Sequence, residues 1–175
     1  MNSASRIILI TGGQRSGKSV LAEKTALSLS QSPVYVATAR IGDDDFRRRV
    51  EIHQQRRGSQ WTNIERPEDL GRLQLTGNVV LIDCVTMWLT NIFFANGEDR
   101  EKSFEVFRDD FDKMISHPAT YILVTNEIGL GGISANAMMR AFTDLQGLAN
   151  QHIAAKADEV YMTVSGIPLK IKPQQ

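Results

Sequence analysis

The stretch Gly12-Gly13-Gln14-Arg15-Ser16-Gly17-Lys18-Ser19 decides the fold of this chain. It follows an apolar run at residues 7–11 and precedes an amphipathic segment that begins near Val20, so the order is strand, loop, helix. The pattern is that of a phosphate loop, in which backbone N–H groups and the positive end of a helix dipole face a bound polyphosphate. Lys18 is expected to reach the β- and γ-phosphates, and Ser19 to ligate magnesium. The alternative is a glycine-rich connector whose lysine only faces solvent.

Length and composition limit what else the chain can be. With 175 residues it is expected to form one nucleotide-binding domain over residues 1–175, large enough to bury a core without disulfides or structural metals. Twenty basic and twenty acidic side chains cancel, so no net charge would recruit nucleic acid or an anionic membrane. Cys84 is the sole cysteine and the longest apolar run is short, which predicts a cytoplasmic protein without a membrane anchor.

Strand-like and helix-like segments alternate along the chain, which predicts an α/β fold with a mostly parallel sheet flanked by helices. The last two apolar segments flank Ser165-Gly166 and predict an antiparallel hairpin at the sheet edge. A small helix is expected to open at residues 67–69. Strands are expected at residues 7–11, 34–38, 61–65, 79–83, 120–126, 159–164 and 167–171, and longer helices at residues 18–30, 44–57, 85–94, 100–116 and 136–155.

Two strand ends carry further candidate site features. The strand at residues 79–83 ends in Asp83, and a carboxylate at the end of a neighbouring strand would hold magnesium through water beside the phosphate loop. The alternative role of Asp83 is to cap the next helix. The glycine-rich loop at residues 127–132 also follows a strand, and it either shapes a substrate pocket or only connects two elements.

One histidine lies among arginines on the helix expected at residues 44–57. A neutral histidine is a competent nucleophile toward an α-phosphorus, so His53 is a candidate for that role. Arg56 and Arg57, one turn further on, could clamp phosphates and spread negative charge. In the alternative, His53 packs on the face of Phe46 and Val50 and the arginines are solvated.

The residues alone leave small-molecule kinases, nucleotidyltransferases and recombinase-like ATPases open. Five segments together, however, resemble one family: T-G-G-Q-R-S-G-K-S at residues 11–19, V-Y-V-A-T-A at 34–39, R-V-E-I-H-Q-Q-R-R at 49–57, V-T-N-E-I-G at 124–129 and A-D-E-V-Y-M-T-V-S-G-I at 157–167. It is the bifunctional adenosylcobinamide kinase/adenosylcobinamide-phosphate guanylyltransferase family of cobalamin biosynthesis. The likeness spans nearly the whole chain.

The resemblance implies a multifunctional transferase with a RecA-like fold that assembles as a homotrimer. ATP or GTP would phosphorylate adenosylcobinamide; GTP would then place GMP on His53, and adenosylcobinamide phosphate would take it. Lys18, Ser19 and Mg²⁺ would position the triphosphate, so the expected catalytic residues are His53, Lys18 and Arg57, and the expected metal ligands are Ser19 and Asp83. Matched by position, the nucleotide-binding residues are Gly12, Gly13, Gln14, Arg15, Ser16, Gly17, Lys18, Ser19, Ala37, Thr38, Ala39, Gln54, Gln55, Arg56, Arg57, Glu65 and Asp83.

The chain departs from the family pattern at a few positions. Ile52 stands where relatives often carry a second histidine, Gly58 where a proline is common, and Asp83 where a glutamate can stand. Residues 131–134 read G-G-I-S instead of G-I-V-P, which leaves the corrinoid contacts open. The alternative functions are a plain P-loop kinase without nucleotidyl transfer and a non-catalytic nucleotide-binding module.

Overall fold

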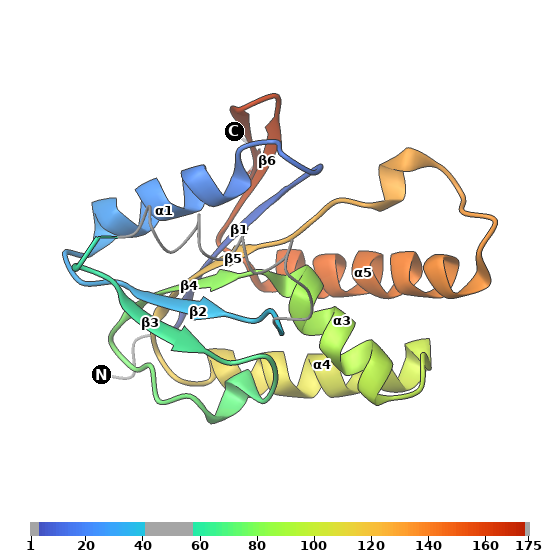
Figure 1. Cartoon of the computed structure of the whole chain (residues 1–175). Coiled ribbons are helices and arrows are strands. Elements are labelled where there is room, and N and C mark those ends of the chain that lie inside the picture. Colours follow the sequence, from blue (N-terminus) through green and yellow to red (C-terminus); the bar gives the residue numbers. More distant parts are fainter. Residues whose placement is uncertain (1–3, 41–57, 174–175) are drawn as a thin grey trace.

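The computed structural model describes residues 4–40 and 58–173 of the 175-residue chain (Figure 1). Its centre is a seven-stranded sheet in the order β3-β2-β4-β5-β1-β6-β7. Strands β1 to β6 run parallel, and β7 pairs antiparallel with β6 at the edge. The strands are β1 (Arg6–Gly12), β2 (Val34–Ala37), β3 (Thr62–Glu65), β4 (Val79–Asp83), β5 (Thr120–Val124), β6 (Glu159–Val164) and β7 (Ile167–Lys172).

Helices cover both faces of the sheet. In Figure 1, α1 lies over one face, and α3, α4 and α5 lie over the other. Successive residues of β1 show the same division, because Ile7 and Leu9 belong to one buried cluster and Ile8 and Ile10 to the other. Strands buried on both faces are continuous apolar runs, as here. The helices are α1 (Lys18–Leu29), α3 (Val85–Ala95), α4 (Arg100–Ile115) and α5 (Ala137–Lys156), with single 3₁₀ turns η1 (Leu70–Arg72) and η2 (Gly129–Gly131).

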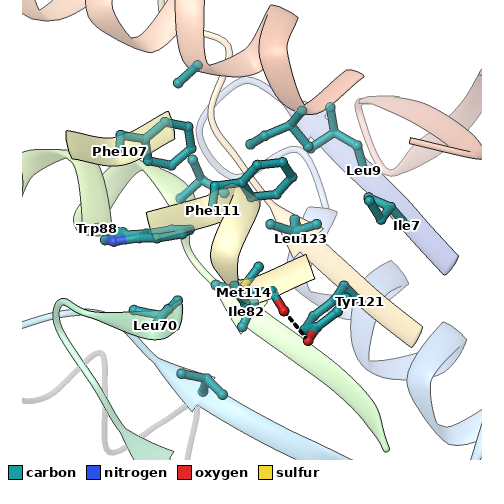
Figure 2. Close-up of a cluster of buried hydrophobic side chains, with 14 of the residues drawn as sticks. Ile7, Leu9, Leu70, Ile82, Trp88, Phe107, Phe111, Met114, Tyr121 and Leu123 are labelled. Carbon is teal, nitrogen blue, oxygen red and sulfur yellow. Dashed lines mark hydrogen bonds between the residues drawn. The ribbon is translucent and has the colours of Figure 1, made fainter. Parts of the chain in front are cut away.

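An aromatic cluster fills the larger core, between the sheet and α3 and α4 (Figure 2). The rings of Trp88 and Phe107 meet edge to face at 4.8 Å, and Phe107 stacks on Phe111 at 6.0 Å. The hydroxyl of Tyr121 on β5 donates to the carbonyl oxygen of Met114 at 2.7 Å, so this buried polar group is paired. The cluster therefore fixes α4 against β5.

The predicted fold class is confirmed: a mostly parallel sheet between helices, with an antiparallel hairpin at its C-terminal edge. The strand expected at residues 120–126 ends at Val124, because the backbone N–H of Asn126 donates to Thr86 Oγ1 instead of a strand. The small helix expected from residue 67 is only the turn η1, which begins after Asp69 in a left-handed conformation (φ 56°). The helix expected at residues 44–57 lies outside the described residues.

No helix in the part of the chain that the structure describes is long and apolar enough to cross a membrane.

Candidate nucleotide-binding site

Four strands bring predicted site residues to one edge of the sheet. Gly12, Ala37, Glu65 and Asp83 are the last residues of β1, β2, β3 and β4. Ala37 is paired in register with Glu65 on one side and with Asp83 on the other. The carboxyl edge of an open parallel sheet is where such folds bind ligands, so residues far apart in sequence converge on a candidate site.

The strand order corrects one expectation. Asp83 was expected on a strand that neighbours β1, but β5 lies between β1 and β4. The loop that follows β5 therefore emerges between the phosphate loop and Asp83. Its backbone contacts the phosphate loop directly, since the N–H of Glu127 donates to Gly12 O at 3.0 Å.

Two glycines of the phosphate loop have backbone conformations that residues with side chains rarely adopt. Gly12 and Gly17 have φ values of 149° and 96°, and Gly17 is the N-cap of α1. A Cβ at Gly12 would lie only 2.5 Å from the backbone oxygen of Thr163, so no side chain fits there. The N-terminus of α1, with its positive dipole end and unpaired N–H groups, thus opens onto the loop.

The hairpin of β6 and β7 is hydrogen-bonded to this loop. Ser16 Oγ and Thr163 Oγ1 share a buried hydrogen bond of 2.7 Å, and the N–H of Gly166 donates to Ser16 O at 3.0 Å. Thr163 and Gly166 are contributors that pattern reasoning missed, because Gly166 was interpreted only as a hairpin turn. The one available signal was the likeness of residues 157–167 to the family. The predicted residue Ser16 is therefore a bracing residue of the loop through its side chain.

Lys18 is buried in the loop, with its Nζ donating to Gly13 O at 2.5 Å. Burial lowers the pKa of Lys18, while the negative charges possible at Cys84 and Asp83 act to raise it. Burial disfavours the charged form of Lys18, and a phosphate bound in the loop would stabilise that charge. Gly13, Gln14 and Arg15 are exposed on the same loop.

Asp83 lies beside Lys18 and fits the role of a magnesium ligand. Its Oδ2 accepts a hydrogen bond from the Tyr35 hydroxyl at 3.1 Å, which orients the carboxylate. Magnesium at phosphate sites is usually held by a hydroxyl or one or two carboxylates, with phosphates and water completing the shell. Ser19, on the first turn of α1, and Asp83 provide that set. Among residues 4–40 and 58–173 no group of three or more His, Cys, Asp or Glu could hold an ion alone.

Thr38 braces the end of β2 against β4. Its Oγ1 accepts from the N–H of Cys84 at 2.9 Å and donates to Cys84 O at 2.7 Å, and its own carbonyl accepts from Asn91 Nδ2 at 2.7 Å. Thr38 is completely buried, so its side chain holds the site together. Burial is the main cause that raises the pKa of the Cys84 thiol to about 12, which favours its protonated form.

The remaining predicted residues divide into two groups. Ala39 is half-buried after β2, and Glu65 is exposed at the end of β3. His53, Gln54, Gln55, Arg56 and Arg57 lie outside the described residues.

A phosphate loop on a mostly parallel sheet, with a lysine buried in the loop and a carboxylate beside it, defines a P-loop nucleotide-binding protein. An ATPase from the type III secretion system of pathogenic bacteria has the same fold, with a TM-score of 0.58 and 15% sequence identity over 90% of this chain and 50% of that one. Such a likeness shows the fold alone.

Sequence comparison gives the family. Residues 8–171 match the family described as cobinamide kinase / cobinamide phosphate guanyltransferase. The bifunctional adenosylcobalamin biosynthesis protein CobU of Escherichia coli strain K12 is 39% identical over 181 aligned positions, which cover 95% of this chain and 99% of the relative. CobP of Pseudomonas aeruginosa, with the same description, is 36% identical over 94% of this chain and 96% of its own. The chain belongs to this enzyme family.

Proposed function

We propose that this protein phosphorylates adenosylcobinamide and then transfers GMP from GTP to adenosylcobinamide phosphate. The observation that carries the proposal is the buried Lys18 in a phosphate loop, with Asp83 beside it, in a chain of the cobinamide kinase / cobinamide phosphate guanyltransferase family. The family description names both a kinase and a guanyltransferase, and the relatives are named bifunctional adenosylcobalamin biosynthesis proteins, which supports a reaction in two halves. ATP and GTP are the proposed phosphoryl donors, and the 175 residues act as one nucleotide-binding domain.

In the first reaction the loop binds the triphosphate. Its backbone N–H groups and the N-terminus of α1 face the phosphates, and Lys18 exchanges its contact with Gly13 O for the β- and γ-phosphates. The substrate hydroxyl attacks the γ-phosphorus and the nucleoside diphosphate leaves, with Lys18 and Arg15 stabilising the charge that develops. Ser19 and Asp83 would hold Mg²⁺, which neutralises phosphate charge when bound.

In the second reaction His53 is the proposed nucleophile. A P–N bond forms between its imidazole and the α-phosphorus of GTP, pyrophosphate leaves, and Arg57 neutralises the departing charge. A phosphate oxygen of adenosylcobinamide phosphate then attacks the same phosphorus, which releases His53 and gives adenosylcobinamide-GDP. These roles rest on the resemblance of residues 49–57 to the family.

The same resemblance supports nucleotide contacts at Ala37, Thr38, Ala39, Gln54, Gln55, Arg56 and Glu65, and a homotrimeric assembly. Thr38 would act by holding the end of β2 in place, because its hydroxyl is paired with Cys84, its N–H with Asp83 O and its carbonyl with Asn91. The cytoplasmic location expected from the single cysteine stays a prediction.

The intact mass of the protein after incubation with GTP and Mg²⁺, without corrinoid, tests this function. The wild type should gain one GMP that is lost in acid and kept in alkali, as a phosphoramidate is, and His53→Ala should gain nothing. His117→Ala is the matched control and should gain GMP like the wild type. An adduct that persists in His53→Ala would refute the nucleophile. No adduct at all, with normal phosphorylation of adenosylcobinamide, would reduce the protein to a plain kinase.

A further inference from the structure

A cavity of about 360 Å³ lies between the loop that follows β5 and the first turns of α5. Its lining is mainly apolar, and no charged side chain in the described part of the chain contributes to it. Ligand pockets of drug-sized molecules have volumes of roughly 300 to 1,000 Å³ and similar linings. Side chains in the lining include Thr86, Ile128, Ile133, Met139, Phe142 and Thr143.

One end of the cavity wall is joined to the phosphate loop by a backbone hydrogen bond. Glu127, adjacent to Ile128 in the wall, donates its N–H to Gly12 O at 3.0 Å. Thr86, also in the wall, accepts from the N–H and from the side-chain Nδ2 of Asn126, each at 3.1 Å. In Figure 1 the loop leaves the sheet edge at β5 and arches over to the start of α5. The wall of the cavity therefore continues, through Glu127, from the backbone that contacts the phosphate loop.

Several apolar side chains of this loop and of the start of α5 are exposed in the described part of the chain. Ile133 is 92% exposed and Leu130 is 75% exposed, both on the loop after β5. Met139, on the first turn of α5, is 42% exposed. Single exposed apolar residues are ordinary, but several of them around one uncharged cavity mark a ligand-binding surface.

The loop is held in shape although it is rich in glycine. The carboxylate of Glu127 accepts from the N–H of Gly129 at 3.0 Å. Arg140 on α5 donates to the carbonyl oxygens of Ser134 at 2.9 Å and Ala135 at 2.8 Å. A preorganised wall loses little conformational entropy when a ligand binds, so the loop is suited to recognition as well as to connection.

We infer that this cavity and its rim bind the corrinoid acceptor, with the edge of the macrocycle in the cavity and Leu130 and Ile133 packed against the ring. The inference rests on the proposed function and locates its second substrate. A corrinoid carries methyl groups and uncharged amide side chains around its rim, which match an apolar lining with the hydroxyls of Thr86 and Thr143. An anionic ligand would find no cation among the described residues that line this cavity.

Calorimetric titration of adenosylcobinamide and of GTP into separate samples of wild type, Ile133→Asp, Ile133→Leu and Val106→Asp tests the assignment. Ile133 is 92% exposed, so its substitution is expected to leave the fold intact. Removing one apolar contact of this size and replacing it with a charge should weaken adenosylcobinamide binding about tenfold or more, with GTP affinity unchanged. Ile133→Leu and the exposed control on α4, Val106→Asp, should bind both ligands within about twofold of wild type.

The outcomes test the location of the corrinoid site separately from the proposed function. Wild-type affinity for adenosylcobinamide in Ile133→Asp would overturn the location and leave the proposed function standing. A wild type that binds GTP but not adenosylcobinamide would overturn both. Light scattering on the same samples would reveal a subunit contact: a change of assembly in Ile133→Asp with unchanged corrinoid affinity refutes the inference.

Discussion

Replacing Gly12 with alanine should destabilise the whole fold, because the structure leaves no room for a Cβ at this position. The added carbon would lie 2.5 Å from the Thr163 backbone oxygen, 2.6 Å from its Oγ1 and 2.7 Å from Ser16 Oγ. The φ of Gly12 is 149°, which residues with side chains rarely adopt. Strained dihedrals cost about 1–3 kcal/mol and overpacking about another 1–3 kcal/mol. The expected loss is therefore about 2–6 kcal/mol, a large share of the roughly 5–15 kcal/mol of a typical domain.

Guanidinium denaturation followed by tryptophan fluorescence measures this loss, since Trp88 is fully buried and will report unfolding. Thermal unfolding of a chain of this size should shift downward by about 2–4 °C for each kcal/mol lost. Gly13→Ala is the matched control, because a Cβ there meets nothing within 4 Å. It should unfold within about 0.5 kcal/mol of wild type. Equal stability of Gly12→Ala and Gly13→Ala would refute the close approach of β6 to the phosphate loop.

Three further changes test the site and the packing around it. Lys18→Met should weaken GTP binding by about tenfold to a hundredfold, because it removes a hydrogen bond to a charged group, while the unfolding midpoint stays within a few degrees. Calorimetric titration measures the affinity, and an unchanged value would contradict phosphate binding by Lys18. Asp110→Ala should lower the free energy of unfolding, measured by denaturation, by about 1–3 kcal/mol, because the carboxylate accepts from two N–H groups of η1 at 2.9 and 2.8 Å. A smaller loss would mean that water takes the place of the carboxylate as the acceptor. Lys170 and Arg6 hold the pKa of Glu159 at about 2, below its usual 4.5, so this carboxylate stabilises the fold above pH 4.5 and the contribution is lost as the pH falls toward 2. Glu159→Gln should then be about 1 kcal/mol less stable than wild type at pH 7, because solvent screens these pairs, and equally stable near pH 2; a difference that persists at pH 2 would exclude ionisation as its cause.

Much of the fold was predictable because its signals are local. The glycine spacing and Lys18 identified the phosphate loop, the apolar runs marked the strands, and Ser165-Gly166 marked the edge hairpin, which β6 and β7 confirm. Misplaced ends, such as that of β5, came from tertiary bonds that local patterns do not contain, here the one between Asn126 and Thr86.

The candidate site was predictable only in part. The phosphate loop and Asp83 lie at the same edge as expected, but their separation by β5 depends on strand order, which periodicity does not specify. The sequence left two roles open for the loop after β5, shaping a substrate pocket or only connecting two elements. The cavity that this loop lines against α5 favours the first role.

The sequence by itself determined the phosphate loop, the alternation of strands and helices, and the family, because each depends on residue types at short, fixed spacings. The tertiary structure alone decided that β5 lies between β1 and β4 and that Thr163 supports Ser16 across 147 positions of the chain. It also decided that the hydroxyl of Thr38 is used to brace β4. These contacts arise when a sheet buried on both faces selects one strand order and register, and that choice depends on the packing of the whole core.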